Sequence, residues 1–168
     1  YGFEIAEQLG WRLPAHVVVP TAGGTILPKV AKAFRGLRDL GLAEGESKIY
    51  SAQAAGCAPV IQALHRGTDL ITPVKPSTTA KSIASGNPAD GYYVLKAVRE
   101  SGGWGEAVTD AEIVDGIKLL ARTEGIFTEP AGGRTVAVTK KLIEQGRIPK
   151  DESIVISVTG NGYKTVEA

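Results

Sequence analysis

Short runs of apolar, often β-branched residues recur along the chain, separated by segments whose apolar positions have helical spacing. The runs predict β-strands at residues 16–20, 48–53, 126–128 and 152–158. The first and the last run are almost continuously apolar, which is typical of strands buried on both faces. This alternation predicts an α/β fold, in which helices cover both faces of a parallel sheet.

The segments between these runs are predicted to form amphipathic helices. In one of them Val30, Phe34 and Leu37 recur at helical spacing, and Gly41 marks the end. Another helix begins at a capping box, in which the side chains of Thr109 and Glu112 each accept a hydrogen bond from a free backbone N–H. The predicted helices are residues 3–10, 26–40, a short one through 60–64, 91–100, one from the capping box to Gly125, and 131–145.

Length and composition describe an ordinary globular domain. The chain has 168 residues, 43% of them hydrophobic, and no internal repeat or second domain boundary, so residues 1–168 are expected to form one domain.

The net charge of +1 gives no case for a nucleic-acid or membrane partner. A single cysteine predicts a reducing, cytoplasmic location. Because the chain begins with Tyr1 and has no methionine, we expect a piece of a longer protein.

A candidate phosphate site follows the first predicted strand. Thr21, Ala22, Gly23, Gly24 and Thr25 lead directly into a helix, so small residues would let backbone N–H groups approach an anion near the helix N-terminus. The same string is equally compatible with a plain tight turn. Since neither the triphosphate-binding nor the dinucleotide-binding glycine motif occurs, the phosphate monoester of a small cofactor remains as the candidate ligand.

The other candidate residues carry weaker signals. Thr159 follows the last predicted strand, where its hydroxyl could meet a ring nitrogen, although a turn without a ligand is favoured by this string alone. His16 and His65 have no partners at metal-ligand spacing, which favours core or solvated histidines and no metal site. Cys57 is expected to be a small buried residue rather than a nucleophile.

Several stretches, in order and across essentially the whole chain, resemble the threonine synthases of bacteria and archaea. The resemblance implies the fold type II of pyridoxal-phosphate enzymes, with residues 1–168 as most of the cofactor-bearing large domain. It also implies pyridoxal 5'-phosphate as cofactor and O-phosphohomoserine as substrate, which water converts to threonine and phosphate. The stretches that carry the resemblance are residues 3–11, 16–20, 51–59, 82–90, 121–131 and 159–162.

The resemblance also assigns roles to residues. Residues 21–25 correspond to the cofactor-phosphate loop, although relatives have a Gly-Asn-Ala-Gly-Asn-like or Gly-Ser-Gly-like string there, so only the backbone contacts are expected to persist. Ser82 corresponds to a small residue against one face of the pyridine ring, and Thr159 to the hydroxyl at the ring nitrogen. A neutral partner for that nitrogen would leave a weaker electron sink than a carboxylate does.

No catalytic residue is assigned to this chain. The family's Schiff-base lysine lies in a serine-phenylalanine-lysine-aspartate-like motif, and none of the 11 lysines here has that context. We therefore expect the lysine and the small domain upstream, an inactive isolated chain, and a homodimer for the full-length protein. Residues 86–90 favour the synthase, while a threonine or serine dehydratase, a cysteate synthase, and a non-catalytic phosphate-binding module remain as alternatives.

Overall fold

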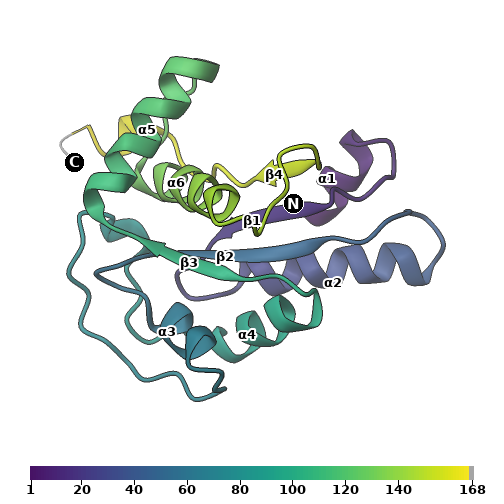
Figure 1. Ribbon diagram of the computed structural model, residues 1–168, viewed down its shortest axis with the longest axis horizontal. Helices are drawn as coiled ribbons and strands as arrows, with labels where there is room; N and C mark the ends of the chain where they lie inside the picture. Colours follow the sequence, from purple (N-terminus) through teal and green to yellow (C-terminus); the bar gives the residue numbers. More distant parts are fainter. Residues whose placement is uncertain (167–168) are drawn as a thin grey trace.

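The computed structural model describes residues 1–166. Within these residues four strands form one parallel sheet in the order β3-β2-β1-β4. Val18 on the central strand β1 lies opposite Tyr50 of β2 on one side and Ile156 of β4 on the other. The parallel α/β fold predicted from the sequence is thus confirmed (Figure 1). The strands are β1 (His16–Pro20), β2 (Lys48–Ala54), β3 (Gly105–Val108) and β4 (Ile154–Ile156).

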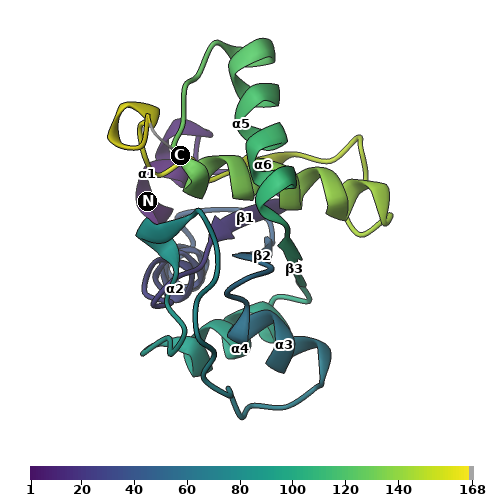
Figure 2. The ribbon, with the colours of Figure 1, turned by 90° about the vertical axis from the view of Figure 1, so that its left-hand side faces the viewer.

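Helices cover both faces of the sheet. One face carries α2, α3 and α4, the other carries α6, against which α5 packs, and α1 packs against α2 (Figure 2). The bounds are α1 (Gly2–Gln8), α2 (Ile26–Asp39), α3 (Pro59–His65), α4 (Gly91–Glu100), α5 (Asp110–Glu124) and α6 (Pro130–Glu144), within two residues of the predicted ones. The capping box of α5 is present, and Gly125 ends that helix in the left-handed conformation with φ of 67°. No helix among residues 1–166 combines the length and the apolar character that a membrane span requires.

The continuous apolar character of β1 follows from its position between two cores. Val17 and Val19 pack into one cluster with Phe34 of α2 and other residues of α1 to α4. Val18 points to the opposite face, where it joins a cluster with Val138 of α6. Because successive side chains of a strand alternate between faces, a strand covered on both sides must be apolar at every position.

The structure differs from the prediction at several places. The last predicted strand, residues 152–158, is shorter, and β4 is a half-buried edge strand rather than one buried on both faces. The predicted strand at residues 126–128 is wrong, because only Thr128 pairs, in an isolated antiparallel bridge with Asn161, while Ile126 and Phe127 are about half exposed. The strand β3 was not predicted, since it is short and its apolar pattern is interrupted by Glu106. Two 3-10 turns, η1 (Lys81–Ile83) and η2 (Gly162–Lys164), were not predicted either.

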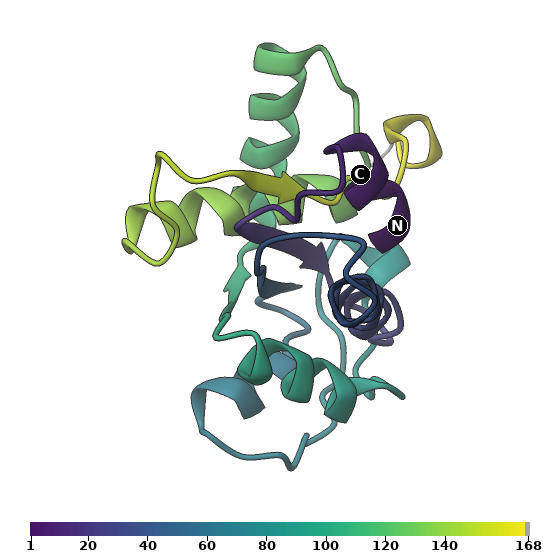
Figure 3. The same ribbon diagram turned by 90° about the vertical axis from the view of Figure 1, so that its right-hand side faces the viewer.

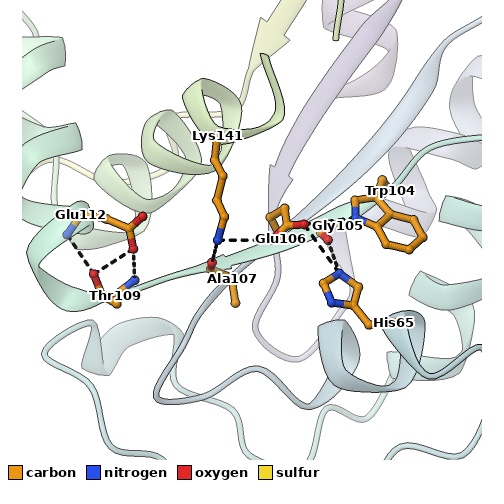
Figure 4. A network of polar contacts seen from close by, with 8 residues as sticks. All are labelled: His65, Trp104, Gly105, Glu106, Ala107, Thr109, Glu112 and Lys141. Atoms are coloured by element: carbon orange, nitrogen blue, oxygen red, sulfur yellow. Dashed lines mark hydrogen bonds and ion pairs between the residues drawn. The ribbon is translucent and has the colours of Figure 1, made fainter. Parts of the chain in front are cut away.

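The edge strand β3 is capped by side chains. Alternate carbonyls of a strand point to opposite sides, so the carbonyls of Gly105 and Ala107 face away from β2. The ring Nε2 of His65 bonds the first at 2.9 Å, and Lys141 Nζ donates to the second at 2.9 Å. The carboxylate of Glu106 lies between them, 3.3 Å from Lys141 Nζ and 3.8 Å from His65 Nε2 (Figure 4). An unpaired edge invites pairing with another chain, and these contacts protect it.

Candidate functional site

The parallel sheet brings the segments that follow β1 and β4 to the same edge. Ligands of open α/β sheets bind outside the carboxyl ends of the strands. β1 and β4 are neighbours, and their pairing continues beyond β4 through a 3.0 Å hydrogen bond from the Ser157 N–H to the Val18 carbonyl (Figure 3). The loop at residues 21–25 and Thr159 therefore leave adjacent strands in the same direction.

The loop after β1 presents free backbone donors. Within residues 1–166 the N–H groups of Ala22, Gly23, Gly24 and Thr25 have no hydrogen-bond acceptor. Gly24 has a φ of 98°, which favours glycine. The loop also leads into α2, whose N-terminus adds positive potential. These features fit the binding of an anion.

A second helix begins beside this loop. Asp90 is the N-cap residue of α4, and its backbone N–H donates to the Gly23 carbonyl at 2.9 Å. A Cβ on Gly24 would lie 2.9 Å from Val94 Cγ2 and 3.0 Å from the Asp90 carbonyl carbon. The loop is therefore wedged between the starts of α2 and α4, and only a glycine fits at position 24.

The two threonine hydroxyls of the loop are already engaged. The Thr21 hydroxyl shares a buried 2.8 Å hydrogen bond with the Ser51 hydroxyl of β2. The Thr25 hydroxyl donates to Asp90 Oδ2 at 2.8 Å. The donors that remain available in the loop are therefore those of the backbone.

Ser82 and Gly160, the residue after Thr159, both contact a carboxylate that the sequence analysis missed. Ser82 Oγ donates to Glu129 Oε2 at 3.3 Å, and the Glu129 side chain packs against the backbone of Gly160. Thr159, the neighbour of Gly160, is partly exposed, and its hydroxyl forms no hydrogen bond within the described residues. The signal for Glu129 was its place before Pro130, at the N-cap of α6, where an acidic residue faces the helix N-terminus.

Arg134 is the other residue that the sequence analysis missed. Its side chain is fully buried, and Nη1 donates to the Thr21 carbonyl at 3.3 Å. Its Nε and Nη2 have no partner in the part of the chain that the structure describes. Burial lowers the pKa of the guanidinium to about 9, against a smaller opposing effect of Cys57. The signal was an arginine between small and apolar residues of the buried face of α6.

The histidines and the cysteine lie in the core or in structural contacts. His16 is buried, with Nδ1 2.9 Å from the Tyr50 hydroxyl and Nε2 2.5 Å from Glu152. Cys57 is buried, and desolvation raises the pKa of its thiol, which disfavours the nucleophilic thiolate. Among residues 1–166 no three His, Cys, Asp or Glu side chains gather in a way that could hold a metal ion.

The residues at this edge fit a cofactor that has a phosphate monoester and a ring. The free N–H groups of residues 22–25 and the unpaired guanidinium of Arg134 suit the phosphate. Ser82 also borders an open hollow of about 530 Å³ together with Pro130 and Tyr163. Fold and site together fit a class of α/β enzymes that would anchor the phosphate of a cofactor at a strand–loop–helix turn.

The chain belongs to the family of pyridoxal-phosphate dependent enzymes, because residues 1–160 match the model of that family. The cofactor predicted from the resemblance is the one that defines this family. The chain is 42% identical, over 99% of its length, to a threonine synthase of Methanocaldococcus jannaschii, and 41% identical, over 97%, to that of Methanosarcina acetivorans. It spans 41% and 40% of the length of these two relatives.

Solved structures share the fold at lower sequence identity. A fungal L-serine ammonia-lyase from Rhizomucor miehei matches with a TM-score of 0.74 and 21% identity over 95% of this chain and 49% of its own. Maize serine racemase matches with a TM-score of 0.71 and 22% identity over 96% of this chain and 48% of its own. At such identities these likenesses establish the fold alone.

Proposed function

We propose that this chain is the cofactor-bearing part of a threonine synthase, which converts O-phosphohomoserine and water to threonine and phosphate. The observation that carries the proposal is the 42% identity to a threonine synthase across 99% of the chain. Because the chain spans about two fifths of that relative, residues outside it would complete the active site. This chain would then contribute the phosphate anchor and the ring contacts.

The residues of the chain have binding and orienting roles in this proposal. The N–H groups of residues 22–25 would hold the cofactor phosphate at the start of α2. Ser82 would contact the ring of the cofactor, and Thr159 would offer its hydroxyl to the ring nitrogen. Glu129 orients Ser82 through their hydrogen bond of 3.3 Å. Together these residues would hold and orient the ring at the edge of the sheet.

The chemistry divides between the cofactor and the protein. When bound, pyridoxal phosphate supplies the electron sink that eases proton removal next to the substrate's amino group. Thr159 is neutral and would donate a hydrogen bond to the ring nitrogen, so it would leave that nitrogen less protonated than an anionic carboxylate would. Proton transfer then depends on a lysine, which the family motif places outside these 168 residues.

Product analysis tests the proposal against its alternatives. The protein, expressed as its gene encodes it, is incubated with cofactor and with O-phosphohomoserine, threonine or serine in separate reactions. We expect threonine and phosphate in equal amounts from the first substrate. Ammonia released mainly from threonine or serine would assign a dehydratase. Cofactor binding without turnover of any substrate would assign a non-catalytic module.

The 168-residue chain alone is expected to be inactive and to attach no cofactor covalently. The reaction needs an amine that bonds the cofactor, leaves it when substrate arrives and then moves protons. The chain is incubated with pyridoxal phosphate and reduced with borohydride, and any modified lysine is mapped while threonine release is assayed. Stoichiometric labelling of one lysine together with turnover would contradict the expectation.

A further inference from the structure

The guanidinium of Arg134 lies directly behind the phosphate loop. It reaches from the second turn of α6 to the end of β1, where it bonds the carbonyl of Thr21, the first residue of the loop. Buried polar groups of proteins are nearly always hydrogen-bonded, and buried charges are nearly always paired. Arg134 departs from both rules, since two of its three nitrogens have no partner in the described chain and no carboxylate there pairs with it.

We propose that Arg134 is a positioning residue for the phosphate loop, which orients the loop's N–H groups and supplies the positive charge that a bound phosphate monoester neutralises. This inference rests on the proposed function and deepens it. Arg134 need not touch the phosphate, because it acts through the peptide that follows Thr21. The sequence alone assigned no role to this residue.

Peptide geometry links Arg134 to the loop donors. In a planar, trans peptide the carbonyl oxygen and the N–H point in opposite directions. Because Arg134 holds the Thr21 carbonyl, the N–H of Ala22 points away from the guanidinium. The backbone N–H of the α4 N-cap residue holds the Gly23 carbonyl, which orients the N–H of Gly24 in the same way. Two of the loop's free donors are thus set by contacts from different helices.

The charges around the loop also indicate that Arg134 favours phosphate binding. Among the described residues, the Asp90 carboxylate accepts a hydrogen bond from the loop residue Thr25. Its negative charge would repel a phosphate. Arg134 is completely buried, and with a pKa lowered by desolvation to about 9 it still carries its charge near neutral pH. An unpaired buried cation destabilises the protein without ligand, and a nearby anion offsets that cost. Without a bound phosphate, the positive charge of Arg134 therefore has no negative partner among the described residues.

The test compares Arg134→Met, Arg134→Lys and the control Arg122→Met, which removes an exposed arginine on α5. The affinities for inorganic phosphate and for pyridoxal phosphate are measured by calorimetry, and the bound phosphate is observed by ³¹P NMR. We expect Arg134→Met to weaken both affinities by about tenfold and to shift the ³¹P resonance. Arg134→Lys keeps the charge and recovers most of the affinity, and Arg122→Met matches the wild type.

Thermal unfolding without ligand separates positioning from a structural role. Methionine removes the desolvated charge, so Arg134→Met is expected to unfold at the same temperature as the wild type or higher, although it binds phosphate less tightly. A variant that binds phosphate like the wild type, or that loses affinity only because it no longer folds, overturns the role of Arg134. A wild-type protein that binds neither probe overturns the phosphate loop itself, and with it the proposed function.

Discussion

The carboxylate of Glu129 occupies the space that a side chain at position 160 would fill. A Cβ built on Gly160 would lie 1.7 Å from Glu129 Oε1 and 2.3 Å from its Cδ. The Glu129 N–H also donates to the Gly160 carbonyl at 3.2 Å, so the two residues are held together by backbone and side chain. This contact places a carboxylate beside the residue that follows Thr159 and within hydrogen-bond distance of Ser82.

Replacing Gly160 by alanine is expected to displace the Glu129 side chain. The methyl group needs the volume that the carboxylate fills, so we expect a loss of about 1–3 kcal/mol in the free energy of unfolding. Urea denaturation measures it. The matched control is Gly36→Ala in α2, where a Cβ has no neighbour within 4 Å and should stabilise the helix by about 0.5–1 kcal/mol. Equal stability of both variants would mean that Glu129 adapts freely.

Alanine at Gly24 is expected to damage the phosphate loop, and alanine at Gly23 is not. Gly24 has a φ of 98° and close contacts to Val94 and Asp90, whereas a Cβ on Gly23 meets nothing within 4 Å. Gly24→Ala should lose about 1–3 kcal/mol of stability and bind phosphate less tightly. Gly23→Ala should stay within about 1 kcal/mol of the wild type. Urea denaturation and phosphate titration of the two variants test this difference. Equal stability and equal phosphate affinity of the two variants would contradict it.

Aspartate at Thr159 is expected to change the electronics of the bound cofactor. A carboxylate next to the ring nitrogen favours its protonated form and stabilises a carbanion too broadly, so side reactions should increase relative to threonine formation. Absorbance spectra and product ratios of the cofactor-loaded protein measure this. Thr159→Ser retains the hydroxyl and should resemble the wild type. Unchanged spectra and products in Thr159→Asp would contradict the assignment of Thr159 as the partner of the ring nitrogen.

Leucine at Lys141 is expected to open the capped edge of β3. The substitution removes the donor to the Ala107 carbonyl and the cation 3.3 Å from Glu106, at an expected loss of about 1–3 kcal/mol in unfolding free energy. Light scattering should also show more self-association, because an uncapped edge can pair with another chain. Lys140→Leu is the control, since Lys140 has only an exposed pair with Glu144 among the described residues and should change stability by less than about 0.5 kcal/mol.

The capping box should make stability depend on pH through Glu112. The hydrogen bond from the backbone N–H of Thr109 is the largest cause that lowers the pKa of Glu112 below its ordinary value of 4.5 in the folded protein. A lowered folded pKa means that the stabilisation is present above about pH 4.5 and is lost as the pH falls through the folded value. Glu112→Gln should therefore flatten the pH dependence of unfolding below pH 4.5. Urea denaturation of the wild type and of Glu112→Gln at a series of pH values measures this difference.

The sequence by itself determined the class of fold and most of its elements. Continuous apolar runs, helical spacing and end signals such as the Thr109–Glu112 box depend on burial and on local hydrogen bonds, which neighbouring residues already specify. These signals placed the helices and three of the four strands of the described sheet. They also singled out residues 21–25 as a candidate anion loop, because small residues before a helix leave backbone N–H groups accessible.

Only the tertiary structure decided what those elements meet. β3 is a strand because β2 pairs with it, whereas Ile126 and Phe127 are apolar but find no neighbouring strand. Glu129 lies 47 positions from Ser82, and Arg134 lies 113 positions from Thr21, yet each pair is in hydrogen-bond contact. Such contacts depend on how α6 packs across the face of the sheet. A local pattern can specify that a residue is buried, but the topology of the chain specifies the group against which it is buried.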